Sequence, residues 1–599
     1  MAKKFYKDCL NYPFQVDLIH KKKKLIKREL LERGTFIEKR IAILGGSTTS
    51  EIKDILELFL LKEGIQACFY ESEFNKYYED IIFKNPSLED FKPDIIYIHT
   101  TEKNIQVSTR ANNSVEGIER IVQEEIARFT SIWDSINRDY NCIIIQNNFE
   151  LPRTRVLGNL DCWDIHGRSF LIQKLNSGFA QYAQAHQNFH INDIHYLSAW
   201  FGLEKWHDNR FWYSYSYAVS YDAIALLSHN IVKIIRAVYG KRNKCLVLDL
   251  DNTIWGGVIG DDGPDNIEIG EETAISKAYS AFQQYVKNLQ DLGILLAVCT
   301  KNNFDIATEG FNHPDNILKH KDFVSFKANW DPKYVNIKGI AEEINIGLDS
   351  MVFIDDNPAE RDLMRAQVPD VEVPEVGSEI IKYIEFIDMG GHFEPASLSQ
   401  DDLQRNRFYE DNTQRNNLQA TYADYGEFLE SLEMVAEIKP FVPMYLERIN
   451  QLINKTNQFN LTTKRHSFTE IKAVSQDRRN ITLYGKLIDR FGDNGLISVI
   501  IGSIRENDLH IHIWVMSCRV IKRDMEFAMF DELVRTCVTH GVERITGYYY
   551  KTIKNEMVAE HYALMGFELV EEQEGKASIW KFEIPQNYYN KNETIKVNA

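Results

Sequence analysis

One short apolar run that ends in two aspartates constrains this 599-residue chain more than any other segment. Residues 245–248 are Cys-Leu-Val-Leu, and the chain continues as Asp249-Leu250-Asp251. An apolar run of this length predicts a buried strand. Side chains alternate along a strand, so Asp249 and Asp251 project the same way. Two such carboxylates repel each other unless a cation or a reaction uses them.

Phosphoryl transfer is the chemistry that suits this pair of acids. One aspartate attacks phosphorus, the second moves a proton, and Mg²⁺ screens the charged oxygens. Gly256 and Gly257 follow within a few residues. Glycines there end the strand and let backbone approach a ligand closely. The segment therefore predicts a phosphate site at the end of a strand.

Three further features follow in order along the chain. Thr300 ends a second apolar run and offers a hydroxyl to phosphate, and Lys333 in the stretch Trp-Asp-Pro-Lys offers a cation. A third apolar run, residues 351–354, ends in Asp355 and Asp356. Together these features cover what phosphoryl transfer needs, which is positioning and charge neutralisation.

The ordered motifs resemble the haloacid dehalogenase (HAD) superfamily, and the sequence DLDNTIWGG resembles its FkbH-like branch (subfamily IIIC). The resemblance implies that Asp249 forms an aspartyl phosphate, that Asp251 is the general acid/base, and that the backbone carbonyl of Asp251 faces Mg²⁺. It further implies these roles: phosphoryl binding by Thr300; charge neutralisation by Lys333, with Lys338 as second choice; substrate contacts by Asn252, Thr253, Lys301 and Asn302; and Mg²⁺ binding by Asp249, Asp251, Asp355 and Asp356.

Composition excludes several classes of protein. The net charge of -18 argues against a nucleic-acid binder. The eight cysteines form no CxxC pair, which favours free thiols in a reducing compartment. No stretch of about 20 apolar residues is long enough to span a bilayer, and residues 1–14 do not resemble a signal peptide. We therefore expect a cytoplasmic protein without membrane insertion.

Three α/β domains are expected, joined in part by a helix. Residues 1–235 alternate apolar runs with helical segments, which predicts a parallel sheet. They resemble an SGNH hydrolase-like domain with a flavodoxin-like sheet, in which Ser47, Asp193 and His195 are the candidate hydrolase residues. Asn192 stands where that family has aspartate, so a scaffolding or binding role is favoured over an active hydrolase.

Residues 236–395 are expected to form a Rossmann-like, uncapped HAD phosphatase domain. A helix is predicted at 278–292, a strand at 294–299 and a helix around 340–346. Only about 28 residues separate Asp249 from the first of these helices, fewer than the roughly 40 that a self-supporting domain needs. That spacing predicts a flap, and an uncapped site accepts a large or protein-borne substrate.

Residues 396–430 are expected to be a connecting helix, and residues 431–599 resemble a GNAT-like acyltransferase domain. We predict its first helix at 446–460, a strand at 484–489 and its central strand at 512–519. Lys522 and Asp524 replace the glycines of the family's pyrophosphate turn. The resemblance implies acetyl-CoA or the phosphopantetheine arm of a carrier protein as ligand, with these binding residues: Arg519, Lys522, Arg523, Asn555 and Tyr562.

The function that these features favour is a Mg²⁺-dependent HAD phosphatase or phosphotransferase. The FkbH-like resemblance implies an acyl phosphate substrate, with glyceryl transfer to an acyl carrier protein in secondary-metabolite or surface-polysaccharide biosynthesis. One departure is Leu250, where acyl-transferring members carry cysteine; Cys299 is a substitute or a core residue. A plain small-molecule phosphatase with a separate acyltransferase activity, and a scaffold with an inert HAD domain, are the alternatives.

Overall fold

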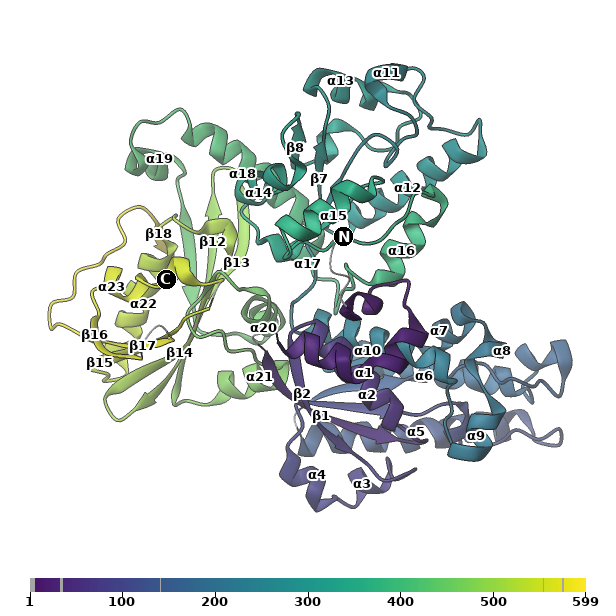
Figure 1. Ribbon diagram of the computed structural model, residues 1–599. Helices are drawn as coiled ribbons and strands as arrows, with labels where there is room; N and C mark the ends of the chain where they lie inside the picture. Colours follow the sequence, from purple (N-terminus) through teal and green to yellow (C-terminus); the bar gives the residue numbers. More distant parts are fainter. Residues whose placement is uncertain (1–5, 33–35, 141, 553, 574–575, 599) are drawn as a thin grey trace. The chain divides into compact units, whose positions relative to one another are not determined.

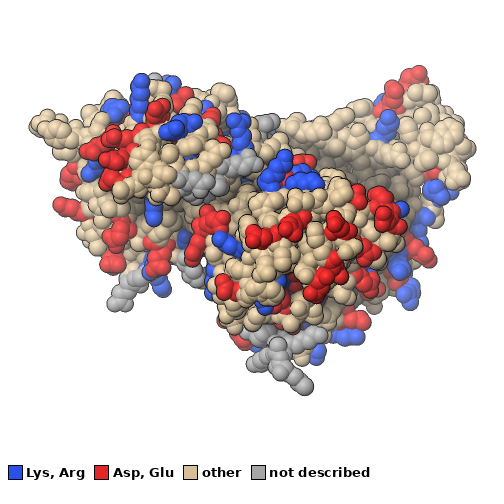
Figure 2. Space-filling view, turned by 90° about the horizontal axis from the view of Figure 1, so that it is seen from above, with Lys and Arg blue, Asp and Glu red and all other residues tan. Residues whose placement is uncertain are grey.

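The computed structural model describes residues 6–32, 36–140, 142–552, 554–573 and 576–598 (Figure 1). The chain divides into two compact units, Met1–Arg236 with Ser467–Thr469 and Ala237–His466 with Glu470–Ala599. The second and third expected domains thus fall in one unit. On the face seen in Figure 2, acidic and basic side chains are interspersed. Within the described ranges, no helix has the length and apolar character needed to cross a membrane.

The first unit is built on a parallel five-stranded sheet in the order β2-β1-β3-β4-β5. The strands are β1 (Ile37–Gly45), β2 (Ile65–Glu71), β3 (Ile95–His99), β4 (Ile143–Asn147) and β5 (Phe189–Asn192). Every residue of β3 and β4 is buried, as expected for a sheet covered on both faces. The longer helices of the unit are α1 (Val16–Leu31), α2 (Ser50–Lys62), α5 (Val115–Asp139), α6 (Arg168–Ala185) and α10 (Ile224–Val238).

The second unit begins with a parallel four-stranded sheet in the order β8-β7-β6-β9. The strands are β6 (Cys245–Leu248), β7 (Leu295–Thr300), β8 (Ser325–Ala328) and β9 (Met351–Ile354). The longer helices are α12 (Ala274–Asp291), α14 (Lys333–Glu343), α15 (Pro358–Gln367) and α16 (Tyr383–Gly390). The helix predicted at 340–346 is therefore the end of α14, which already begins at Lys333.

Between β6 and α12 the chain forms only a small flap, residues 252–273. It contains the single-turn helix α11 (Ile259–Asp262) and an isolated antiparallel bridge between Gly256 and Glu268. The flap has no sheet of its own among these residues, all of which are described. The structure therefore has the predicted flap, and no cap domain, between β6 and α12.

A second, mixed sheet follows, in the order β16-β17-β15-β14-β13-β12-β10-β18, with β11 paired to β14 off this path. The strands are β10 (Val435–Lys439), β11 (Phe459–Asn460), β12 (Asn480–Asp489), β13 (Gly492–Arg505), β14 (Asp508–Met516), β15 (Arg544–Tyr550), β16 (Glu568–Gln573), β17 (Ala577–Glu583) and β18 (Lys596–Asn598). Its helices include α20 (Leu446–Lys455), α22 (Met525–Thr539) and, before the sheet, α18 (Arg405–Gln419) and α19 (Tyr425–Ser431).

Two predicted boundaries in this region are wrong. The helix predicted at 446–460 ends at Lys455, because Phe459 and Asn460 instead pair with Met516 and Val515 of β14. The central strand predicted to reach residue 519 ends at Met516, where a turn of 3₁₀ helix follows over Cys518–Val520. In both cases a tertiary contact decides where a locally continuous pattern stops.

Candidate active site

The sheet order brings the separate aspartate motifs to one edge. β6 lies between β7 and β9, and Leu248 is in register with both Val298 and Ile354. The residues that follow these positions therefore meet at the carboxyl edge of the sheet, where open α/β sheets bind ligands. The Asp249 backbone N–H donates to the Ile354 carbonyl at 3.0 Å, which fixes the first aspartate beside the end of β9.

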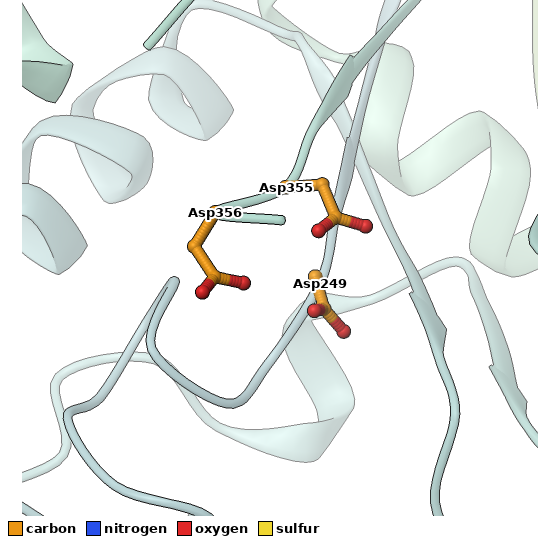
Figure 3. Close-up of side chains that lie close together, drawn as sticks. All are labelled: Asp249, Asp355 and Asp356. Atoms are coloured by element: carbon orange, nitrogen blue, oxygen red, sulfur yellow. The ribbon is translucent and has the colours of Figure 1, made fainter. Parts of the chain in front are cut away.

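Three carboxylates converge at this edge (Figure 3). One oxygen from each of Asp249, Asp355 and Asp356 lies within 4.8 Å of the others. Asp355 is fully buried and Asp249 nearly so. The Asp249 Oδ1 atom is buried and has no hydrogen-bond partner among the described residues. Unpaired buried carboxylate oxygens are costly, so this cluster is suited to a cation or a reacting group.

Lys333 supplies the positive charge that faces the cluster. Its Nζ atom lies 2.9 Å from Asp249 Oδ2 and 2.6 Å from Asp355 Oδ2. Burial opposes the charged form, but the two carboxylates raise the pKa of Lys333 above its ordinary value. Lys338, the second choice from the sequence, is exposed on the same helix. Of the two lysines, Lys333 is therefore the one that contacts the acids.

The electrostatics of Asp355 show how crowded the charges are. Burial, followed by repulsion from Asp249, raises the pKa of Asp355 to about 6, although Lys333 works in the opposite direction. Burial also raises the pKa of Asp356. One ammonium group is therefore too little positive charge for the cluster, and a bound cation would favour the ionised carboxylates.

Asp251 occupies a different position from the three clustered acids. Its Oδ1 atom accepts hydrogen bonds from the Trp255 indole at 2.9 Å and from the Ile259 backbone at 3.1 Å. Its Oδ2 atom accepts from the Asn302 amide at 3.2 Å. Burial raises the pKa of Asp251, which suits a group that must hold a proton and release it. Its carboxylate lies outside the three-acid cluster.

The remaining residues predicted around the site contribute unequally. Thr300 and Thr253 are buried, and the Thr253 hydroxyl has no hydrogen-bond partner in the described structure. The Asn252 side chain accepts from the Gly257 backbone at 3.1 Å and so shapes the flap. Lys301 forms an ion pair with Glu360 at 2.6 Å. The ammonium group predicted to contact substrate is therefore paired with a carboxylate of the chain itself.

Sequence reasoning missed Trp255, which is fully buried and donates to Asp251. The available signal was its place in the motif, four residues after Asp251 and directly before the paired glycines. A tryptophan at that position has an N–H that needs a partner once the ring is buried.

In the first unit, the candidate hydrolase residues make separate contacts. The Ser47 hydroxyl is buried without a described partner. Asp193 caps α7 (Ile194–Phe201), accepting from the Tyr196 backbone at 3.1 Å, and also accepts from Asn148 at 2.7 Å. The His195 ring contacts the Phe149 carbonyl at 3.2 Å. None of these hydrogen bonds joins the serine, aspartate and histidine into a triad.

The turn after β14 keeps a glycine-like backbone without glycine. Lys522 and Asp524 have φ angles of 67° and 59°, in the left-handed region. Between them, Arg523 is buried and lies 3.3 Å from Asp489. The hydroxyl of Tyr425 donates to the Lys522 carbonyl at 2.5 Å. The Arg523 guanidinium and the Lys522 carbonyl are therefore engaged by the chain itself.

The other residues predicted to bind an acyl group or pantetheine are also occupied or enclosed. The Arg519 guanidinium lies 4.2 Å from the centre of the Phe408 ring. The Asn555 amide donates to the Asn460 carbonyl at 2.8 Å. Tyr562 is fully buried, and its hydroxyl has no partner in the described part of the chain. Each of these three side chains is therefore in contact with, or enclosed by, other parts of the chain.

The strands β14 and β15 diverge, and β11 with Leu461 lies between them. They pair in parallel only from Asp508 to Ile511 on β14. Beyond that point the Leu461 N–H donates to the Trp514 carbonyl at 3.3 Å, and its carbonyl accepts from the Tyr550 N–H at 2.8 Å. A backbone segment of the chain thus bridges the two strands where they separate.

Comparisons with known proteins indicate the family of the chain. Residues 40–236 match the family model described as FkbH, N-terminal domain. The N-terminal part of the protein BF1531 from Bacteroides fragilis, whose structure contains a phosphatase domain complexed with Mg, is 32% identical; the match covers 63% of this chain and 99% of that one, with a TM-score of 0.58. No match was found among curated proteins.

Other solved structures resemble about a quarter of the chain at low identity. The ribosomal-protein-S18-alanine N-acetyltransferase from Escherichia coli is 12% identical, covering 26% of this chain and 99% of its own, with a TM-score of 0.21. PaiA N-acetyltransferase from Thermoplasma acidophilum is 14% identical, covering 25% and 98%, with a TM-score of 0.19. The identity and coverage of the Bacteroides fragilis match carry the assignment: the chain belongs to the FkbH-like proteins and carries a HAD-type phosphatase domain.

Proposed function

We propose that this chain is a Mg²⁺-dependent phosphatase or phosphotransferase in which Asp249 becomes phosphorylated. The observation that carries the proposal is the Asp249 carboxylate. Its Oδ2 atom is held by Lys333 at 2.9 Å, while its Oδ1 atom is buried and unpartnered among the described residues. A carboxylate held by one oxygen presents the other to phosphorus as a nucleophile.

The donor set fits Mg²⁺, which prefers carboxylate oxygens. Asp249, Asp355 and Asp356 would hold it, since their oxygens lie within 4.8 Å of one another and their three charges outweigh the single ammonium of Lys333. Bound there, Mg²⁺ would neutralise charge on the phosphoryl oxygens. The relative from Bacteroides fragilis was itself obtained with Mg.

Proton transfer falls to Asp251. In its protonated form Asp251 gives its proton to the leaving oxygen as Asp249 takes the phosphoryl group. The ionised Asp251 then accepts a proton from the water, or from the acceptor hydroxyl, that attacks the phosphoaspartate. Trp255 and Asn302 orient its carboxyl group through the hydrogen bonds at 2.9 and 3.2 Å. Thr300 and Lys333 would bind the phosphoryl oxygens during both steps.

The substrate that we propose is an acyl phosphate, with a carrier protein as acyl acceptor. The small flap supports this choice, because it leaves the carboxyl edge open to a large substrate. The cysteine chemistry supports plain hydrolysis of a small phosphate as the second candidate. Leu250 offers no thiol, and Cys299 is fully buried, which raises the pKa of its thiol.

The test is hydrolysis of 4-nitrophenyl phosphate in the presence of Mg²⁺. Asp249→Asn keeps the shape of the side chain and removes the attacking charge, so we expect kcat to fall by about 10³ or more. Lys338→Ala is the matched control, because Lys338 is exposed on the helix that carries Lys333. Turnover by Asp249→Asn at the wild-type rate would contradict the proposed nucleophile.

A further inference from the structure

Large apolar side chains are exposed beside three of the four segments that build the active site. They are Val258 (40% exposed), Phe304 (50%), Trp330 (71%) and Val335 (48%). Val258 belongs to the flap after Asp251, and Phe304 follows the Thr300 segment in sequence. Trp330 and Val335 flank Lys333. Single exposed apolar residues are ordinary, but this set comes from the segments that converge on one site.

Trp330 differs from an ordinary exposed side chain because its ring is tethered. The indole N–H donates to the Asn303 side chain at 3.1 Å. The Asn303 backbone donates to the Asn302 side chain at 2.9 Å, and the Asn302 amide donates to Asp251 at 3.2 Å. A chain of hydrogen bonds therefore links the exposed ring to the proposed general acid/base.

The backbone that carries Trp330 is fixed as well. The Asn329 side chain accepts from the Asp331 backbone at 3.0 Å. The amides of Asn329 and Asn336 also exchange two hydrogen bonds, at 2.8 and 3.2 Å. These contacts anchor the turn before Lys333 to helix α14. The ring is held in place although most of its surface contacts solvent, so it is organised before any ligand arrives.

We propose that Trp330 is a specificity-determining residue, whose ring packs against the part of the substrate beyond the transferring phosphoryl group. This inference rests on the proposed phosphatase function. Because the flap contains only one short helix, the leaving group must meet the rim of the site. A fixed indole there favours acyl or aryl leaving groups that carry flat or apolar surface over small ones such as acetate.

The test compares two substrates, 4-nitrophenyl phosphate, which has a ring, and acetyl phosphate, which has none. In wild type and variants, we measure the ratio of kcat/KM for the aryl substrate to that for acetyl phosphate. Trp330→Ala should lower this ratio about tenfold, mainly through a higher KM for the aryl substrate, because uniform binding is lost. Trp330→Phe keeps a ring and should restore most of the ratio.

Controls separate this inference from the function on which it rests. Tyr589→Ala removes an exposed aromatic ring elsewhere in the second unit and should leave the ratio unchanged. An active enzyme whose ratio is the same in wild type and Trp330→Ala would overturn the inference alone. A fall in kcat that is equal for both substrates would also overturn it, since it would show a structural role. If wild type hydrolyses neither substrate, or Asp249→Asn hydrolyses both, then the proposed function and the inference both fail.

Discussion

The carboxyl edge of β6, β7 and β9 can be compared with the turn that follows β14 in the same unit. Both contain buried charged groups where a phosphate ligand was expected. At the first, an oxygen of Asp249 is buried with no partner in the described structure, beside a lysine shared by two acids. At the second, the buried Arg523 meets Asp489 and the Asn412 side chain, at 3.3 and 2.6 Å.

This difference in pairing distinguishes a candidate binding site from a region that only stabilises the fold. Buried polar groups that are fully paired stabilise one structure, and buried groups that stay unpaired are retained at a cost that function explains. Asp489 shows the paired case clearly. Its carboxylate also accepts two hydrogen bonds from Arg415 of α18, each at 2.8 Å, and these lower its pKa although burial opposes them. The turn after β14 is accordingly expected to stabilise the domain.

If that comparison holds, replacing Arg523 should cost stability and leave phosphoryl transfer unchanged. Arg523→Met leaves Asp489 with Arg415 as its remaining cationic partner, so we expect a loss of about 2 kcal/mol. Hydrogen exchange of the β12 and β14 amides measures this loss locally. The adjacent and exposed Lys522 is the matched control, and Lys522→Met should change stability by less than about 0.5 kcal/mol. Reduced hydrolysis of an aryl phosphate by Arg523→Met would break the comparison.

Ligand binding sharpens the same comparison with a smaller effect. With Arg523 paired and Leu461 bridging β14 and β15, acetyl-CoA should bind no tighter than millimolar, which corresponds to about 4 kcal/mol. A phosphopantetheine arm has one phosphodiester and therefore needs fewer phosphate contacts from the turn. The guanidinium of Arg523 is already paired with Asp489, however, so it is not free to bind that phosphodiester either. Isothermal titration calorimetry with each ligand decides this. Micromolar binding of acetyl-CoA would instead indicate a second active site in the chain.

The sequence predicted the carboxyl edge of β6, β7 and β9 better than the turn after β14, and the reason is physical. Each motif of the phosphatase site follows a short buried strand, so local pattern alone places Asp249, Thr300 and Asp355 at strand ends. Parallel strands then bring such ends to one edge, whatever the connections between them. Lys333 was chosen over Lys338 from its motif, and the structure puts it beside two of the acids.

What the sequence did not reveal are contacts between distant segments. The pairing of Asn460 with β14 ends the preceding helix early, and the ion pair of Arg523 with Asp489 spans separate elements. Likewise, no sequence pattern around Trp330 predicts its hydrogen bond to Asn303. Such contacts depend on tertiary packing, which overrides helix and strand propensities and carries no periodic pattern along the chain.

Ser47 tests whether an unpaired buried group always marks an active site. Like Asp249 Oδ1, its hydroxyl has no hydrogen-bond partner among the described residues. Burying an unpaired hydroxyl, however, costs far less free energy than burying an unpaired charge. It also lacks an organised base, since the His195 ring contacts the Phe149 carbonyl and Asp193 caps α7. We therefore expect the Ser47→Ala variant to keep full aryl phosphatase activity. Its free energy of unfolding should change by no more than about 1 kcal/mol. We also expect that a fluorophosphonate probe does not label the wild-type protein. Covalent labelling at Ser47, confirmed by mass spectrometry and absent from Ser47→Ala, would show an active serine in the first unit.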